Sequence, residues 1–295
     1  MNSIFESWHH ELTNQLSYLL DNLTPEHKFR EVIKYSSLPA GKLFRPLIVM
    51  SLAKDLGTIS EDHRLFACCL EMHHTYTLIH DDLPAMDNDD FRRGRLSSHK
   101  KFTEFEAILA GDALLNMSYE VIAGMKHPKS IKLLQYMTTY TGPKGLIFGQ
   151  VKDLAQENKT FQDLLKIHEL KTSRLIQLAL TGTSILSNKE EHLDKLYTLG
   201  NSIGINFQLL DDLCELSEIQ KGHELEINPF LTFAPAIVFE EIQKNHKIIE
   251  TTCLELELNN FFDYFKIYLN KVNEIINKNK QTILSQIKTD DFQLF

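Results

Sequence analysis

Two short acidic clusters, each at the end of an apolar stretch, are the residues best suited to chemistry. The first is Asp81-Asp82-Leu83-Pro84-Ala85-Met86-Asp87 and the second is Asp211-Asp212-Leu213-Cys214-Glu215. Asp211 and Glu215 are four residues apart and share one face of a helix, where two like charges destabilise by roughly 0.2–0.5 kcal/mol. A single cluster of this kind is explained equally well as a solvated acidic loop. Two clusters predict Mg²⁺ ions, which proteins usually hold with one or two carboxylates and the phosphates of a substrate.

Cationic residues stand close to these acids in the sequence. The first cluster runs into Phe91-Arg92-Arg93-Gly94-Arg95, and Lys42 and Arg45 lie on the turn at 41–46. Neighbouring Arg and Asp residues are commonly surface ion pairs worth ~0–1 kcal/mol. A guanidinium group also binds two phosphate oxygens at once. In a chain with a net charge of −9, these cations predict a second anion site, separate from the metal-bound one.

The composition limits the class of protein. The 295 residues include 31 Lys and Arg against 40 Asp and Glu, and this acidic balance argues against a nucleic-acid binder. Only 12 Gly and 8 Pro occur, which disfavours an all-β protein with many tight turns. The four cysteines have no disulfide spacing, which favours a reducing compartment: Cys68, Cys69, Cys214 and Cys253. Because we see neither a signal segment nor an apolar run of ~18 residues, we expect a cytoplasmic protein that does not span a membrane.

Helical periodicity runs through most of the chain and supplies the elements that must position these side chains. Leucines from Leu12 to Leu23 form one helical stripe, and Thr24 and Pro25 then predict the start of another helix. Pro84 predicts that the apolar helix over 61–83 ends just beyond the first acids. Further helical patterns cover 103–123, 130–140, 161–186, 190–216, 235–250 and 259–287. With no strand pattern, repeat or linker, residues 1–295 are predicted to form a single all-α domain of about ten helices.

Several segments carry a more specific signal. Residues 74–87 contain the acids in the form DDxxxxD, and residues 89–94 continue the pattern. The segments 107–115, 145–154 and 167–172 follow in order, so the likeness extends from about residue 35 to 216. Together these segments resemble the trans-polyprenyl diphosphate synthase family, and most closely its bacterial farnesyl diphosphate synthase group.

The resemblance implies a fold, a cofactor and two substrate sites. The fold would be an all-α isoprenoid synthase helical bundle with a central active-site cavity, usually found as a homodimer. Several Mg²⁺ ions would be bound by Asp81, Asp82, Asp87, Asp211 and Glu215. The allylic diphosphate would contact Arg92, Lys171, Thr172, Phe207 and Gln208, and isopentenyl diphosphate would contact Lys42, Arg45, His74 and Arg93. Taken singly, Lys171 is explained as a surface lysine and His74 as a buried core histidine.

The implied chemistry needs no side-chain nucleophile. The allylic C–O bond ionises while Mg²⁺, Arg92 and Lys171 stabilise the leaving diphosphate. The isopentenyl double bond attacks the allylic cation, and a proton leaves to the departing diphosphate. Tyr76 and Thr77 lie about one helical turn before Asp81, where a bulky Tyr76 would form a floor and stop the product near C15. Dimethylallyl or geranyl diphosphate would then give farnesyl diphosphate.

The chain also departs from the family pattern. Glu215 makes the second motif DDxxE in place of DDxxD, and Ala40 replaces the first Gly of a Gly-Gly-Lys turn. The segment 217–233 is short, with Lys221 as the one candidate for the first of two usual lysines. These changes keep open a degenerate paralogue that acts as a non-catalytic or regulatory subunit. A terpene cyclase is a weaker alternative, because it has no use for Lys42, Arg45 and Arg93.

Overall fold

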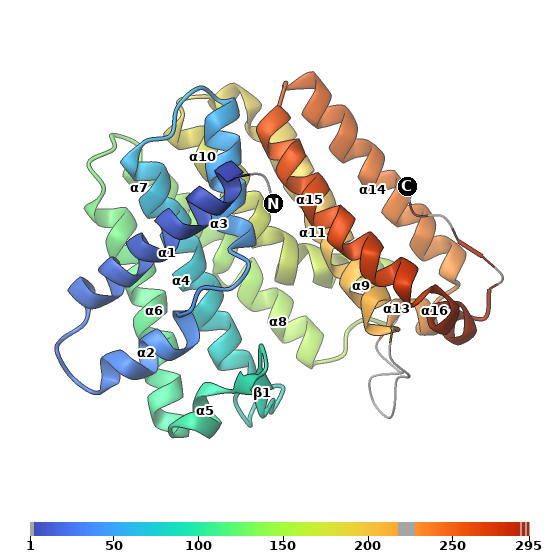
Figure 1. Cartoon of the computed structure of the whole chain (residues 1–295), viewed down its shortest axis with the longest axis horizontal. Helices are drawn as coiled ribbons and strands as arrows, with labels where there is room; N and C mark the ends of the chain where they lie inside the picture. The colour runs from blue at the N-terminus through green and yellow to red at the C-terminus, as the bar shows by residue number, and fades with distance from the viewer. Residues whose placement is uncertain (1–2, 218–227, 290, 293, 295) are drawn as a thin grey trace. The chain divides into compact units, whose positions relative to one another are not determined.

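The computed structural model describes residues 3–217, 228–289, 291–292 and 294 (Figure 1). Helices make up nearly all of the regular structure in these residues, which confirms the all-α class. The contacts divide the chain into two compact units, one made of 1–138 with 182–190 and the other of 139–181 with 191–295. The single domain over 1–295 therefore stays a prediction. None of the described helices is long and apolar enough to cross a membrane.

The first unit is built around one buried helix, α4 (Glu61–Asp81), which packs against α3 (Phe44–Asp55) and α6 (Glu104–Gly124). Every residue from Phe66 to His73 is buried, as expected for a helix that is covered on all sides. Its start is capped by Ser60 and its acidic end is a helix C-terminus. The remaining helices of the unit are α1 (Ser3–Leu23), α2 (Phe29–Ser37), α5 (Ser98–Lys101) and most of α7 (Ser130–Thr141).

A small hairpin follows the first acidic cluster. The strands β1 (Phe91–Arg92) and β2 (Arg95–Leu96) pair antiparallel, with Phe91 opposite Leu96. Arg93 and Gly94 form the turn with φ values of 53° and 74°, the left-handed backbone that two-residue hairpins require. We expected no strand here, because two-residue strands are too short to show an alternating pattern. The hairpin fixes the directions of the three neighbouring arginines.

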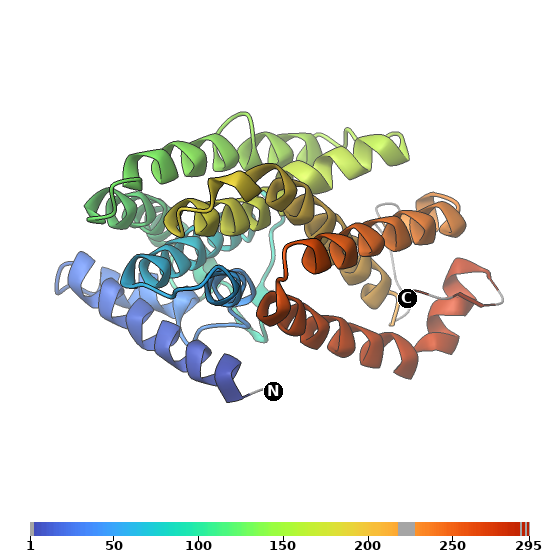
Figure 2. The same ribbon diagram turned by 90° about the horizontal axis from the view of Figure 1, so that it is seen from above.

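The second unit is built around α11 (Leu193–Glu215), which packs against α14 (Pro235–Glu255) and α15 (Asn259–Lys278). α14 and α15 lie side by side (Figure 2). A π-helical turn, η1 (Glu169–Ser173), connects α9 (Phe161–His168) to α10 (Arg174–Leu186) and contacts both α8 (Leu146–Leu154) and α11. The short elements are η2 (Glu190–His192), α13 (Pro229–Thr232) and α16 (Lys280–Ile287).

Several predicted helix boundaries were wrong. Thr24 and Pro25 do not start a helix: α2 begins at Phe29, and the Thr24 hydroxyl donates to the Leu20 carbonyl at the end of α1. The helix predicted over 161–186 is interrupted by the π-helical turn, and the stretch over 259–287 is interrupted at Asn279. Periodicity alone also missed α8. Helical pattern detects a buried face, whereas these interruptions depend on neighbouring helices.

Candidate active site

The first acidic cluster lies at the C-terminal end of α4, where the helix dipole disfavours negative charge. Asp82 is buried, and its Oδ1 accepts hydrogen bonds from Arg92 Nε at 2.8 Å and Nη2 at 2.5 Å. Arg92 Nη2 also donates to Asp89 Oδ2 at 3.0 Å. Burial raises the pKa of Asp82, and the hydrogen bonds and charge of Arg92 oppose that shift. The guanidinium group therefore compensates a carboxylate that both burial and the helix end destabilise.

The rest of this cluster forms a tight turn. The Asp87 amide donates to the Asp81 carbonyl at 2.9 Å, so the chain folds back and Asp87 returns to the end of α4. Within the described residues, no three His, Cys, Asp or Glu side chains stand close enough to hold a metal ion by themselves. This arrangement is compatible with Mg²⁺, which relies on substrate phosphates and water for most of its ligands.

A cleft of about 230 Å³ opens beside these acids within the first unit. It is lined by the end of α2, the segment 39–41, one side of α4 and the hairpin, and it contains Asp82, Arg92 and Arg93. The Arg93 guanidinium lies against Gly41, where an added Cβ would be 2.6 Å from Nη1. Gly41 is therefore needed for this approach. Ala40, the departure from the family turn, also lines the cleft.

His74, which also lies on α4, is close to several arginines. Burial lowers the pKa of His74 well below its usual value, and the charges of Arg45, Arg93 and Arg92 lower it further. Arg45 is buried on α3, and Lys42 is exposed in the loop before that helix. The predicted isopentenyl-site residues thus divide into two groups. Arg93 lines the cleft, whereas Lys42, Arg45 and His74 do not.

The second acidic cluster lies at the C-terminal end of α11. Asp212 is buried, and its Oδ1 accepts a hydrogen bond from Gln208 Nε2 at 3.0 Å. Its Oδ2 is buried and has no hydrogen-bond partner among the residues that the structure describes. Burial raises the pKa of Asp212 well above its usual value, and the charges of Glu215, Asp211 and Asp153 add to the shift. An unsatisfied oxygen among carboxylates fits a hard cation such as Mg²⁺.

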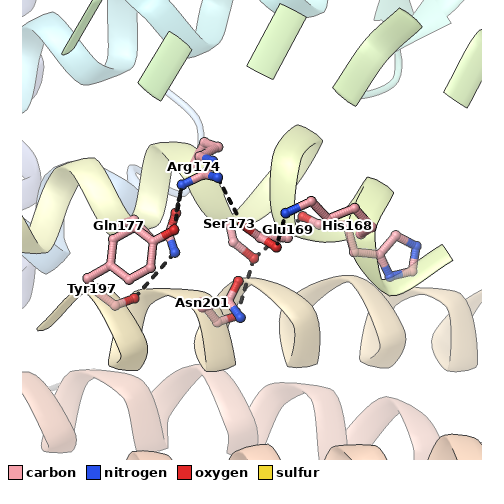
Figure 3. Close-up of polar contacts among 8 residues, drawn as sticks. His168, Glu169, Ser173, Arg174, Gln177, Tyr197 and Asn201 are labelled. Carbon is pink, nitrogen blue, oxygen red and sulfur yellow. Dashed lines mark hydrogen bonds and ion pairs between the residues drawn. The ribbon is translucent and has the colours of Figure 1, made fainter. Parts of the chain in front are cut away.

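Of the predicted allylic-diphosphate residues of the second unit, Lys171 and Thr172 lie in the π-helical turn and Gln208 contacts it. Lys171 Nζ donates to Asp153 Oδ2 on α8 at 2.5 Å. The Thr172 hydroxyl donates to Gln208 Oε1 on α11 at 3.2 Å. Phe207 stacks on Tyr268 with ring centroids 5.2 Å apart. Figure 3 shows the polar contacts that surround this turn, from His168 to Asn201.

The predicted chain-length residues lie on α4 one turn before the acids. Tyr76 is buried with edge-to-face contacts to His73 and His80, and its pKa is raised by burial. Thr77 is half-buried and donates to the His74 carbonyl at 2.8 Å. Neither side chain lines the cleft of the first unit. Their part in product length stays a prediction.

Two residues of the site were missed by sequence reasoning. Asp153 binds Lys171, and Asp212 binds Gln208. Both lay inside segments already identified, 145–154 and 211–215, but Asp153 lies 18 residues from Lys171, and Asp212, four residues after Gln208 on α11, had been assigned no role of its own. Lys221, the candidate loop lysine, lies outside the described residues.

Comparisons with known proteins agree with the family resemblance. The family model described as polyprenyl synthetase matches residues 26–224. The farnesyl diphosphate synthase of Micrococcus luteus is 41% identical over 204 residues, which cover 67% of this chain and 70% of that protein. The Bacillus subtilis farnesyl diphosphate synthase is 38% identical, with 70% and 72% covered. The chloroplastic geranylgeranyl pyrophosphate synthase 12 of Arabidopsis thaliana is also 38% identical, with 64% and 56% covered.

Solved structures extend the likeness over nearly the whole chain. A geranyltransferase from Legionella pneumophila matches with a TM-score of 0.80 at 28% identity and covers 95% of this chain and 97% of its own. A Helicobacter pylori geranyltransferase complexed with magnesium and isoprenyl diphosphate matches with a TM-score of 0.76 and covers 92% and 99%, and at 24% identity it supports the fold alone. From its motifs, its helical fold and these matches, the chain belongs to the polyprenyl synthetase family.

Proposed function

We propose that this protein is a prenyltransferase that condenses isopentenyl diphosphate with dimethylallyl and geranyl diphosphate to give farnesyl diphosphate. The family match and the relatives named farnesyl diphosphate synthase support this activity. The observation that carries the proposal is the cleft in which Arg92 and Arg93 stand beside Asp82. A guanidinium group suits the phosphates of each of the two substrates, and a carboxylate next to these groups suits a cation.

The chain's own residues have separate tasks in this reaction. Arg93, with Lys42, Arg45 and His74, would bind the diphosphate of isopentenyl diphosphate. Arg92, Lys171, Thr172 and Gln208 would bind the allylic diphosphate, with Phe207 beside them. Hydrogen bonds from Arg92 and Lys171 would stabilise charge on the leaving oxygen as the allylic C–O bond breaks. The isopentenyl double bond then attacks the allylic carbon, and the proton that is lost goes to the released diphosphate.

Mg²⁺ is the metal that the donor atoms favour. Asp81, Asp82 and Asp87 would hold it at the end of α4, and Asp211 and Glu215 would hold it at the end of α11. When bound, Mg²⁺ would neutralise the leaving diphosphate and so favour its departure. The Helicobacter pylori geranyltransferase structure contains magnesium together with isoprenyl diphosphate.

The test is product identification after incubation with Mg²⁺, isopentenyl diphosphate and either dimethylallyl or geranyl diphosphate. Farnesyl diphosphate as the product supports the proposal. No turnover with either allylic partner indicates a non-catalytic subunit, the reading that Glu215 and the short 217–233 segment favour. Consumption of an allylic diphosphate without isopentenyl diphosphate indicates a terpene cyclase.

Product length is tested at Tyr76. Relatives named geranylgeranyl pyrophosphate synthase are nearly as similar as the farnesyl enzymes, so family membership alone does not set the length. We expect Tyr76→Ala to give products longer than C15, because removal of the ring opens space one turn below the acids. Thr77→Ser is a mild control at the neighbouring position. An unchanged product distribution in Tyr76→Ala would contradict the role of Tyr76 as a floor.

We also propose that the protein is a cytoplasmic homodimer. Phe105, Ile108 and Leu109 lie on one face of α6, and their side chains are 63%, 43% and 51% exposed. Three neighbouring exposed side chains of this size form an apolar patch of the kind found at protein–protein interfaces. A second copy of the chain would cover it. Light scattering measures the mass directly, and Ile108→Glu should shift the dimer toward monomer. A monomeric wild-type protein would contradict this assembly.

A further inference from the structure

The π-helical turn has a register that an α-helix does not provide. The Arg174 amide donates to the Glu169 carbonyl, a hydrogen bond from residue i+5 to residue i. In an α-helix, residues five apart point about 140° away from each other, because each residue turns the helix by about 100°. In a π-helical turn the same two residues lie one above the other.

The side chains of these two residues form an ion pair across the turn. Arg174 Nη2 lies 2.9 Å from Glu169 Oε1, with the side chains only 13% and 19% exposed (Figure 3). Arg174 Nη1 also donates to Tyr197 OH at 2.8 Å and to Gln177 Oε1 at 3.2 Å. The rings of Tyr140 and Tyr197 each lie 5.7 Å from the guanidinium carbon. The guanidinium is therefore fixed in place, and the π-helical turn brings Glu169 onto the same side as Arg174.

The surrounding packing leaves room for this turn. An added Cβ on Gly149 of α8 would lie 2.5 Å from the backbone nitrogen of Lys171, and one on Gly204 of α11 would lie 2.4 Å from the Cα of Ser173. Both neighbouring helices thus approach the turn at positions without side chains. The Ser173 hydroxyl donates to the Asn201 carbonyl at 3.2 Å and to the His168 carbonyl at 3.4 Å.

Lys171 and Thr172 lie between the two paired residues. Their side chains reach Asp153 and Gln208, respectively, from within the turn. If the turn changed to α-helix, the residues before α10 would rotate by about 100° relative to that helix, the angle of one residue. The register of the turn therefore sets where Lys171 and Thr172 point.

We infer that the Glu169–Arg174 ion pair is a clasp that holds the turn in its π-helical register and thereby positions Lys171 and Thr172 for the allylic diphosphate. Both members are positioning residues, because they act through Lys171 and Thr172. The kinetic part of this inference rests on the proposed function. The structural part does not.

The kinetic test compares Glu169→Ala, Arg174→Ala and the double variant with the wild type. The double variant leaves no buried charge without a partner, so it remains informative if a single variant fails to fold. We expect KM for the allylic diphosphate to rise about tenfold in the double variant and KM for isopentenyl diphosphate to change less than about twofold. The rises in KM for the allylic diphosphate in the two single variants should not be additive, because either substitution alone removes the ion pair. Arg174→Lys, which can still reach Glu169, should recover most of the loss.

Lys166→Ala is the matched control. Lys166 Nζ contacts the other oxygen of the same carboxylate, Glu169 Oε2, at 2.8 Å, but it lies three residues away and is 52% exposed. Its removal takes away one charge contact of Glu169 and leaves the pair across the turn intact. We expect wild-type values of both KM. If Lys166→Ala raised KM for the allylic diphosphate as much as the double variant does, the inferred role of the Glu169–Arg174 ion pair would be contradicted.

A second measurement is independent of turnover. A crystal structure of the double variant should show Glu169–Ser173 as α-helix, with Lys171 no longer on Asp153. A folded double variant that keeps the π-helical turn overturns the inference, as does one with both KM values unchanged. If the wild type shows no turnover, the proposed function fails, and the crystal structure alone still decides the clasp.

Discussion

The helices α4 and α11 both end in acids, yet the two ends are electrostatically different. At the end of α4, the buried carboxylate Asp82 is bound by the guanidinium of Arg92. At the end of α11, the buried carboxylate Asp212 is bound by the amide of Gln208, and its other oxygen has no hydrogen bond within the described part of the chain. Two aspartate pairs that look alike in sequence thus meet a fixed cation in one case and a neutral group in the other. The first end carries its own counter-charge, whereas the second depends more on a cation that binds.

The beginnings of the two helices differ as well. α4 starts with a capping box in which the Ser60 hydroxyl accepts from the His63 amide, and His63 Nε2 also contacts the Ser187 hydroxyl at 3.0 Å. α11 starts at Leu193, and the residue at its N-cap, His192, makes no side-chain capping hydrogen bond. Burial lowers the pKa of His63 from 6.5 to about 4. The first helix therefore carries a buried, neutral histidine at its start as well as an ion pair at its end.

The largest expected difference in activity is between removal of Arg92, the partner of Asp82, and removal of Gln208, the partner of Asp212. Arg92→Ala should lower kcat/KM about a thousandfold, because it removes a cation from the leaving diphosphate and leaves Asp82 buried without its counter-charge. Gln208→Ala removes a neutral amide and should lower kcat/KM about tenfold. Steady-state kinetics at saturating Mg²⁺ measures both. Equal losses would mean that the two acidic ends are equivalent.

The next effect is acid sensitivity at the start of α4. The folded-state pKa of His63 is below its unfolded value, so the unfolded chain binds the proton more readily and stability falls as pH drops from about 6.5 to 4. Between pH 7 and 5 this group should account for about 2 kcal/mol of the loss. Urea unfolding at the two pH values should show a smaller loss in His63→Gln than in the wild type.

His192→Gln is the matched control at the start of α11, where we expect the pH dependence of the wild type. The same pH dependence in His63→Gln as in the wild type would show that His63 is not the group that titrates.

The smallest effect concerns the carboxylates themselves, measured without metal at pH 7. Asp82→Asn should lower the free energy of unfolding by about 1 kcal/mol, a value reduced because Arg92 is 36% exposed and also binds Asp89. Asp212→Asn should change it by less than about 0.5 kcal/mol, because burial already favours the neutral form of Asp212 and Asn can still accept from Gln208. A loss in Asp212→Asn as large as that in Asp82→Asn would show that both groups are equally ionised.

Much of the fold could be predicted from local pattern. The apolar run before Asp81 and that before Asp211 do form long helices, and Pro84 does follow the end of α4. The break at 169–173 could not be predicted, because its residues have ordinary helical propensity and its register is supported by α8, α11 and Arg174. The hairpin at 91–96 was missed because only its turn, Arg93-Gly94, has a distinctive backbone.

The site could be predicted as a set of residues but not as a set of partners. Thr172 does contact Gln208 in the second unit, and Arg92 and Arg93 do share a cleft with Asp82. The partner Asp153 was missed because it lies 18 residues from Lys171, and a contact of that range depends on which helix faces pack together. The partner Asp212 is only four residues from Gln208 on α11, and it was missed because it had been assigned no role of its own.

The sequence by itself determined the all-α class, the family, and the position of both acidic clusters at helix ends. These properties follow from residue type and from short spacing along the chain, which helical periodicity and motif order record directly. Only the tertiary structure decided that Asp82 meets a guanidinium, that Asp153 meets Lys171, and that Lys171 lies in a π-helical turn. Those outcomes depend on buried charge, on close approach at Gly149 and Gly204, and on side-chain pairs brought together by packing, none of which a local pattern contains.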